Sequence, residues 1–72
     1  MADELQFEIK KDFGGFGEGK WQKHPTLIKW GENEEKYDIR PWSPDMTKPG
    51  KGVTLTKEDL YDLMIMIEEV LG

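Results

Sequence analysis

The stretch "KYDIRPW", residues 36–42, carries the alternation of side chains that decides the fold. In a β-strand, successive side chains point to opposite faces of the sheet. Tyr37, Ile39 and Pro41 therefore share one face. The other face receives Lys36, Asp38, Arg40 and Trp42. This pattern predicts a strand that buries its apolar face and turns the face with the charged residues outward.

Three more strands are predicted around this one. Apolar and polar residues alternate over residues 5–9, "LQFEI", which predicts the first strand. Residues 20–30, "KWQKHPTLIKW", predict a longer second strand that is interrupted at Pro25. Proline lacks the N–H that a central strand needs, so we expect an edge position or a bulge there. A short fourth strand is expected over residues 53–55, after a loop that is rich in proline and glycine.

The last part of the chain predicts a helix. Thr56 is placed as its N-cap, and Asp59 three residues later completes a variant of the capping box. The helix is expected to reach about Leu71 and to cover one face of the sheet with an apolar stripe. That stripe consists of Leu60, Leu63, Met64, Ile67, Val70 and Leu71. The expected fold is one α+β domain over residues 1–72, a four-stranded antiparallel sheet followed by one C-terminal helix (β-β-β-β-α).

Three apolar residues of this helix, Tyr61, Ile65 and Met66, lie outside the stripe. A chain of 72 residues builds only a small core, which a second copy can enlarge. The spare apolar residues therefore favour a homodimer with these three at its interface. The alternative is that a small domain simply exposes a few apolar side chains.

The charge of the chain is unevenly distributed. Its formal net charge of −5 opposes non-specific attraction to nucleic acids. Residues 20–51, however, contain seven bases and five acids, a net charge of +2, between flanks of −3 (1–19) and −4 (52–72). The middle of the chain is a basic region that contains all three tryptophans. The alternative is a solvated sheet face whose charges are only scattered.

Composition excludes several classes of protein. There is no Cys and only one His, so neither a disulfide nor a thiolate or multi-histidine metal site is possible, and no cofactor is expected. No apolar run approaches the roughly 18 residues of a membrane span. The N-terminal "MADELQFEIKK" is too polar for a signal peptide. We expect a cytoplasmic protein.

The motifs do not point to an enzyme. "GGFGEGK", residues 14–20, has the spacing of a phosphate-binding loop, but no hydroxyl residue follows the lysine and no helix begins there. We interpret it as a hairpin connection. His24 has no neighbouring nucleophile, and Ser43 belongs to a Ser-Pro turn. A catalytic role is not expected.

The remaining constellation consists of cations and tryptophans. Single-stranded nucleic acids are bound by cations that follow the phosphates and by aromatic faces on which bases stack. The candidate residues are Arg40, Trp42, Lys48, Lys51, Lys36, Lys29, Lys20, Trp21 and Lys23. Pro25 leaves the register of the second strand open, and a slip of one residue turns Trp21 to the other face. Alternatively, Trp42 covers the sheet edge and the lysines only keep the protein soluble.

Residues 36–60, "KYDIRPWSPDMTKPGKGVTLTKEDL", resemble the core signature of the transcriptional positive cofactor four family, and within it the small bacterial YdbC-type members. The similarity covers most of the chain and includes Trp30 at the end of the second predicted strand. The resemblance implies a dimeric sheet-and-helix fold that binds single-stranded DNA, with some capacity for RNA, without strong sequence preference. It further implies a transcription regulator or coactivator-like role.

Residue by residue, the resemblance places the sheet-face arginine at Arg40, the aromatic residue at Trp42 and the basic loop at Lys48 and Lys51. It implies that bases stack on tryptophan while lysine and arginine pair with phosphates across the sheets of a homodimer. The rival interpretation is a protein-interaction module, in which the Trp-rich sheet or the flank of the helix binds a protein partner.

Overall fold

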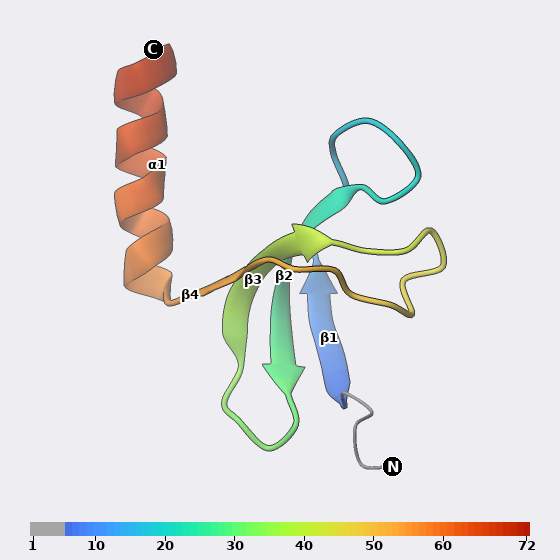
Figure 1. Cartoon of the computed structure of the whole chain (residues 1–72). Coiled ribbons are helices and arrows are strands. Elements are labelled where there is room, and N and C mark those ends of the chain that lie inside the picture. The colour runs from blue at the N-terminus through green and yellow to red at the C-terminus, as the bar shows by residue number, and fades with distance from the viewer. Residues whose placement is uncertain (1–5) are drawn as a thin grey trace.

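The computed structural model describes residues 6–72 as an antiparallel sheet of four strands followed by one helix (Figure 1). The strands lie in the order β1-β2-β3-β4, so each pairs with its neighbour in the chain. The bounds are Phe7–Asp12 (β1), Lys23–Trp30 (β2), Lys36–Pro41 (β3), Val53–Leu55 (β4) and Lys57–Leu71 (α1). The predicted β-β-β-β-α fold is confirmed. Leu5 of the first predicted strand lies outside the described residues.

One side of the sheet holds the buried residues. Directly paired residues of antiparallel strands point to the same face. Thr26 pairs with Asp38, Asp38 pairs with Thr54, and Ile28 pairs with Lys36. We call this side the core face, because Thr26, Ile28 and Asp38 are fully buried on it. The prediction that the face with Asp38 turns outward is therefore wrong, although the residues assigned to it do share a face.

The opposite side, which we call the helix face, carries the other alternating set. Pro25 pairs with Ile39, and Leu27 pairs with Tyr37. All four are half-buried. The apolar residues of β3 thus share one side of the sheet as predicted, but this side is less buried than the core face.

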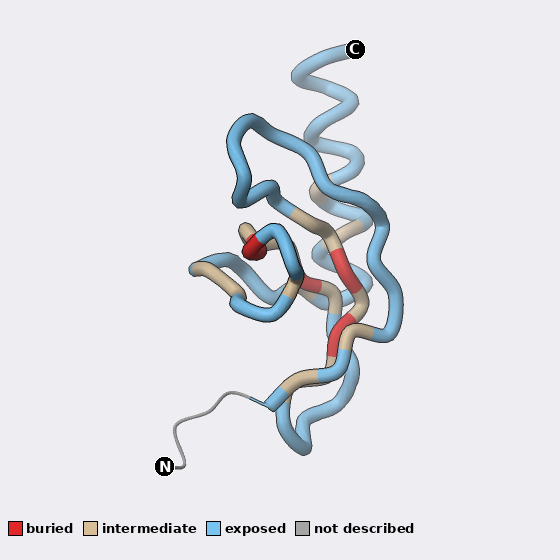
Figure 2. The backbone as a smooth tube through the Cα atoms, turned by 90° about the vertical axis from the view of Figure 1, so that its right-hand side faces the viewer, coloured by how far each residue is buried: buried red, intermediate tan, exposed pale blue. Residues whose placement is uncertain are grey.

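The core is built around tryptophan rings. Trp42, one residue beyond β3, is fully buried, and its ring reaches Trp30 at the end of β2. Its ring stacks on Trp30 at a centroid distance of 6.5 Å and meets the edge of Phe7 at 5.0 Å. Such aromatic pairs add to the free energy gained from burying the rings. Figure 2 shows the buried positions on the central strands and just after β3, while α1 is exposed along most of its length.

Pro25 occupies a central strand without a bulge, which corrects the expectation of an edge position. The pairing of β2 with β3 continues through Pro25 and Ile39 with no change of register. The Pro25 carbonyl accepts a hydrogen bond from Phe13 N, so this residue directs its backbone groups toward β1. The missing N–H therefore removes no ladder bond between β2 and β3, and it faces Phe13, which lies beyond the end of β1 at Asp12. The irregularity of register lies instead in β1, between Ile9 and Lys11.

The start of α1 follows the prediction. The Thr56 side chain accepts a hydrogen bond from Asp59 N, and the Asp59 carboxylate accepts one from Thr56 N, both at 3.0 Å. This capping box satisfies two backbone N–H groups that the helix itself leaves free.

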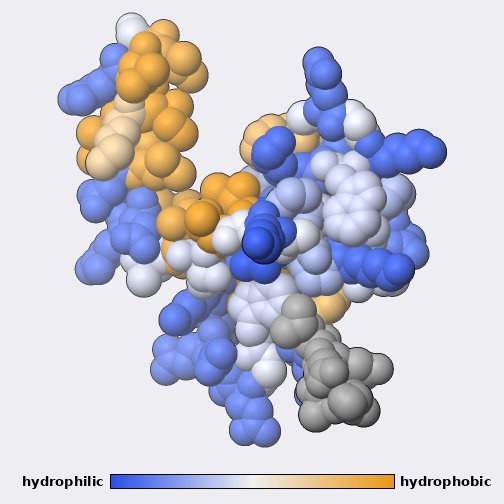
Figure 3. Space-filling model, in the orientation of Figure 1, coloured by the Kyte–Doolittle hydropathy of each residue, from blue (hydrophilic) through white to orange (hydrophobic). Residues whose placement is uncertain are grey.

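The rest of α1 differs from the prediction, because the helix projects beside the sheet instead of covering it (Figure 1). No residue of α1 is buried, and only Leu60 and Leu63 are half-buried. Figure 3 shows hydrophobic side chains along α1 and on the neighbouring part of the sheet. The rest of the predicted stripe, from Met64 onward, and its flank are therefore exposed in the described chain. Among residues 6–72, no helix combines the length and hydropathy required to span a bilayer.

Gly52, directly before β4, lies so close to β3 that a larger side chain does not fit there. A methyl group on Gly52 would overlap the Ile39 carbonyl oxygen and come within 2.7 Å of Arg40 Cα. We expect Gly52→Ala to lower the free energy of unfolding by about 1–3 kcal/mol, because the strand must shift to make room. Urea unfolding followed by circular dichroism measures this change. Gly50→Ala is the matched control, since its nearest contact would be 3.3 Å from the Pro41 oxygen, and equal losses in both variants would contradict the steric explanation.

Candidate nucleic-acid interface

Two loops meet at one end of the sheet. The connection of β1 to β2, residues 13–22, and the connection of β3 to β4, residues 42–52, leave the sheet at the same end because all the strands are antiparallel. A hydrogen bond of 3.0 Å from Trp42 N to Gln22 O ties the two loops together at their base. We call residues 13–22 and 42–52 together the loop end.

The first of these loops is an ordered hairpin. Phe16 and Lys23 exchange two backbone hydrogen bonds of 2.9 Å, and the Gln22 side chain donates to Gly17 O. The second strand was predicted to begin at Lys20, but β2 begins at Lys23. Lys20 and Trp21 therefore lie in the hairpin. Two aromatic side chains of the hairpin are half-exposed, with 51% of Phe16 and 45% of Trp21 accessible to solvent. The hairpin thus presents aromatic surface beside the exposed Lys20.

The second loop is held by hydrogen bonds to one carboxylate. The Ser43 and Thr47 hydroxyls both donate to Asp45 Oδ1 at 2.7 Å. Hydrogen bonds from Thr47 and Ser43 lower the pKa of Asp45 to about 2. Because this pKa is below the ordinary value, the stabilisation is present above the ordinary value and is lost as the pH falls toward 2. The loop exposes two cations, Lys48 and Lys51.

Trp42 does not have the exposure that base stacking requires. Its side chain is fully buried against Trp30 and Phe7, and its backbone bridges to Pro49 in the same loop. The prediction that Trp42 stacks on bases is therefore wrong for this structure. The alternative, that Trp42 covers part of the sheet, agrees with its position.

Arg40 shares a face with Asp38 as predicted, but this is the core face and not an outward one, and the guanidinium is committed to groups of the protein. Nε and Nη2 donate to the two oxygens of Asp38 at 2.5 and 2.7 Å, and Nη1 donates to Gly50 O at 3.3 Å. The guanidinium also lies over the Trp30 ring, 4.7 Å from its centroid. The bidentate pair with the buried carboxylate gives Arg40 a structural role in this state. The prediction of a free phosphate-binding arginine is not met here.

The strand lysines do not form one track. Lys36 is exposed at the start of β3, on the side of Arg40. Lys29 and Lys23 alternate with Thr26 and Ile28 in the other phase of β2, so they point to the helix face. These two candidate residues therefore do not share a face with Arg40, because β2 keeps one register through Pro25. The candidate cations at the loop end are Lys20, Lys48 and Lys51.

Phe16 is the residue that the sequence analysis missed. The sequence predicts only a hairpin connection over residues 14–20, whereas the structure places Phe16 on an ordered hairpin with half of its surface exposed. An aromatic residue between glycines, with no apolar neighbour within two positions, was the available signal.

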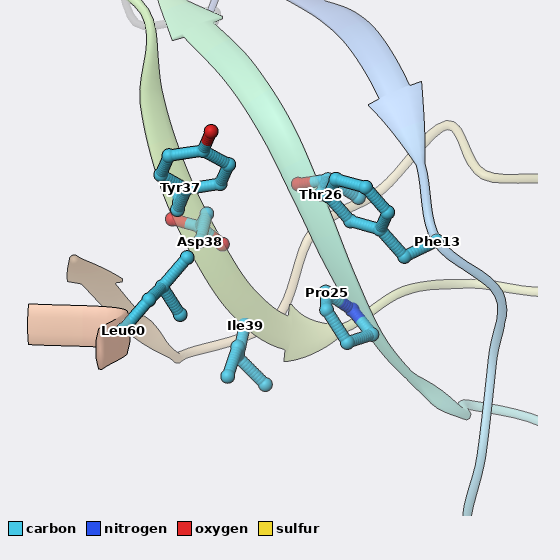
Figure 4. A pocket seen from close by; sticks show the side chains of 7 residues that line it. All are labelled: Phe13, Pro25, Thr26, Tyr37, Asp38, Ile39 and Leu60. Atoms are coloured by element: carbon cyan, nitrogen blue, oxygen red, sulfur yellow. The ribbon is translucent and has the colours of Figure 1, made fainter. Parts of the chain in front are cut away.

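A second surface lies between the sheet and α1. A pocket of about 260 Å³ opens on the helix face and is lined by the seven residues labelled in Figure 4. A further groove follows α1, where Leu63, Met64 and Ile67 line it together with Pro25 and Ile39. The predicted interface residues Tyr61, Ile65 and Met66 are exposed on the flank. Within the described part of the chain, no three His, Cys, Asp or Glu side chains gather in a geometry that could hold a metal ion.

Comparison with known proteins identifies a relative of this chain. A protein of Treponema pallidum (strain Nichols), described only as uncharacterized, is 38% identical over 73 aligned residues, which cover 97% of this chain and 85% of the relative. The two chains belong to one family. The alignment spans both the sheet and the helix, so the relative shares the whole domain. No family model matches the sequence.

Proposed function

We propose that this protein binds single-stranded nucleic acid without sequence preference, DNA and to some extent RNA, as a homodimer in the cytoplasm. The observation that carries the proposal is the hairpin of the loop end, where Phe16 and Trp21 are half-exposed beside Lys20. The resemblance of residues 36–60 to the positive cofactor four family supports the same class of ligand and a role in transcription regulation.

The chemistry of the loop end suits unpaired bases. Aromatic faces stack on any base, and each stack contributes on the order of 1–3 kcal/mol. The second loop leaves the sheet at the same end, and its exposed cations, Lys48 and Lys51, supply partners for phosphates. Bases within a duplex are already stacked and cannot reach these rings, so a preference for single strands follows.

The homodimer is supported by the apolar surface that the chain leaves uncovered. Met64, Ile67, Val70 and Leu71 are all exposed on the stripe of α1, next to the apolar groove on the helix face. A domain of this size gains little stability from its own core. A second copy that lays its α1 along this groove would bury both stripes. The dimer then rests on the stripe itself, with Tyr61, Ile65 and Met66 at its margin.

The proposed function is tested by fluorescence anisotropy of a labelled oligothymidine at low and moderate salt, with the matching duplex as control. Binding that prefers the single strand and weakens with salt is expected. Absence of binding at low salt would overturn the proposal. A complex with a protein partner, held by the apolar groove, would instead resist added salt.

Trp21 and Lys51 are expected to contribute in different ways. Trp21→Ala should weaken oligothymidine binding by about 1–3 kcal/mol with little change in salt dependence, because a stacking face is lost. Lys51→Ala should lower the slope of log K against log salt by about 0.7, the single-strand value for one phosphate contact. Anisotropy titrations at several salt concentrations measure both. Affinity and slope equal to those of the wild type in both variants would remove the loop end as the binding site.

A further inference from the structure

A histidine-carboxylate pair lies at the base of the loop end. His24 Nδ1 is 2.9 Å from Asp12 Oδ1 and 3.1 Å from Asp12 Oδ2. Asp12 Oδ1 also accepts a hydrogen bond from Gly14 N at 2.9 Å, so the pair connects β1, β2 and the first residues of the hairpin. A methyl group on Gly15 would come within 2.6 Å of His24 Nε2, so glycine leaves room beside this nitrogen.

We propose that protonation of His24 strengthens the binding of single-stranded nucleic acid at the loop end. This inference rests on the proposed function and names a regulator of the same site, the proton. With a neutral imidazole, the pair carries the negative charge of Asp12 at the base of a surface that must approach phosphates. With an imidazolium, the pair is neutral, and the repulsion between Asp12 and the phosphates is cancelled.

The surroundings of His24 allow this change of charge. On β3, its register partner is Arg40, whose charge is neutralised by Asp38. On β1 it faces Asp12, and on its own strand Lys23 projects to the opposite face. The hairpin contributes Gly15 and Gln22, which are uncharged. Asp12 is therefore the ionised group in direct contact with the ring.

The pH range of the effect is set by the side-chain types present. Histidine is the side-chain type whose charge ordinarily changes between about pH 5 and 8, and this chain contains one. Asp12 stays ionised in that range: burial raises its pKa, but the hydrogen bonds from His24 and Gly14 outweigh burial and hold the pKa below its ordinary value. Affinity should therefore rise as the pH falls, because proton uptake by His24 favours the bound state.

The test is anisotropy of labelled oligothymidine at about pH 7.0 and 5.5 in constant salt, for the wild type and for His24→Gln. The wild type should bind about three- to tenfold more tightly at the lower pH, as expected for one charge gained near partly screened phosphates. His24→Gln keeps a hydrogen-bond donor toward Asp12 but cannot gain the charge, so its affinity should be the same at both values of pH. Circular dichroism checks that the variant is folded.

A second measurement does not depend on the variant. The ring protons of His24, followed by NMR in the wild-type protein, should titrate at higher pH with the oligothymidine bound than without it. Binding that is independent of pH, an unmoved titration, or full pH dependence in His24→Gln would each overturn this inference while the proposed function stands. Absence of oligothymidine binding at both values of pH would overturn the proposed function, and this inference with it.

Discussion

Trp42→Ala is expected to lower the free energy of unfolding by about 3–5 kcal/mol, the usual cost of deleting a large aromatic side chain from a core. Trp42 is fully buried and joins the loop of residues 42–52 to Trp30 and Phe7. A small domain is stable by about 5–15 kcal/mol, so this single change removes a large part of its stability. The variant should be partly unfolded at physiological temperature.

Urea unfolding followed by circular dichroism measures this effect independently of the lost indole fluorescence. Trp21→Ala is the matched control, because it removes the same side chain from a half-exposed position. We expect the control to keep nearly all of the stability and to lose affinity instead. A Trp42→Ala protein as stable as the wild type would show that the ring lies outside the core in solution.

Ile67→Asp is expected to convert the proposed homodimer into a monomer. Ile67 lies in the stripe of α1, lines the groove beside Ile39, and is 47% exposed in a single chain. In the dimer, the new carboxylate would be buried without a partner, at a cost of several kcal/mol. Sedimentation equilibrium measures the mass directly, and binding of oligothymidine should weaken together with assembly, because two linked sites bind with higher avidity.

The control for this change is Ile65→Asp. Ile65 is 50% exposed and differs from Ile67 chiefly in lying on the flank instead of on the stripe. We expect Ile65→Asp to remain dimeric. A monomeric Ile65→Asp together with a dimeric Ile67→Asp would show that the interface lies on the flank, as predicted from the sequence. A wild-type protein that is monomeric at high concentration would overturn the dimer itself.

The elements that the sequence predicts well are those set by local chemistry. The period of two in β3 and the capping box at Thr56 depend on residues a few positions apart, and both are present. The position of Pro25 was not predictable in the same way. Whether a proline disrupts a sheet depends on which neighbour its nitrogen faces, and therefore on where β1 ends.

The candidate site was harder to predict than the fold. Alternation correctly groups Asp38 with Arg40, but it cannot tell which face is buried when two charged residues neutralise each other. Trp42 is expected to be exposed because it continues a polar face, whereas its ring packs in the core against Trp30 and Phe7. The exposed rings at the loop end depend on the path of the hairpin, which glycine-rich sequence leaves undetermined.

An alanine scan of the basic residues would give a misleading result at Arg40, because Arg40 is paired with the buried Asp38 carboxylate. Removing the guanidinium would leave the Asp38 carboxylate buried with the Thr54 hydroxyl as its one remaining side-chain donor among residues 6–72, so the strands around it would loosen. A large loss of affinity in Arg40→Ala would then reflect disturbed folding. The same loss would look like the removal of the strongest contact with the nucleic acid. The substitutions that can be interpreted directly are those at Lys20, Lys48 and Lys51, which are exposed and form no ion pair with a described carboxylate.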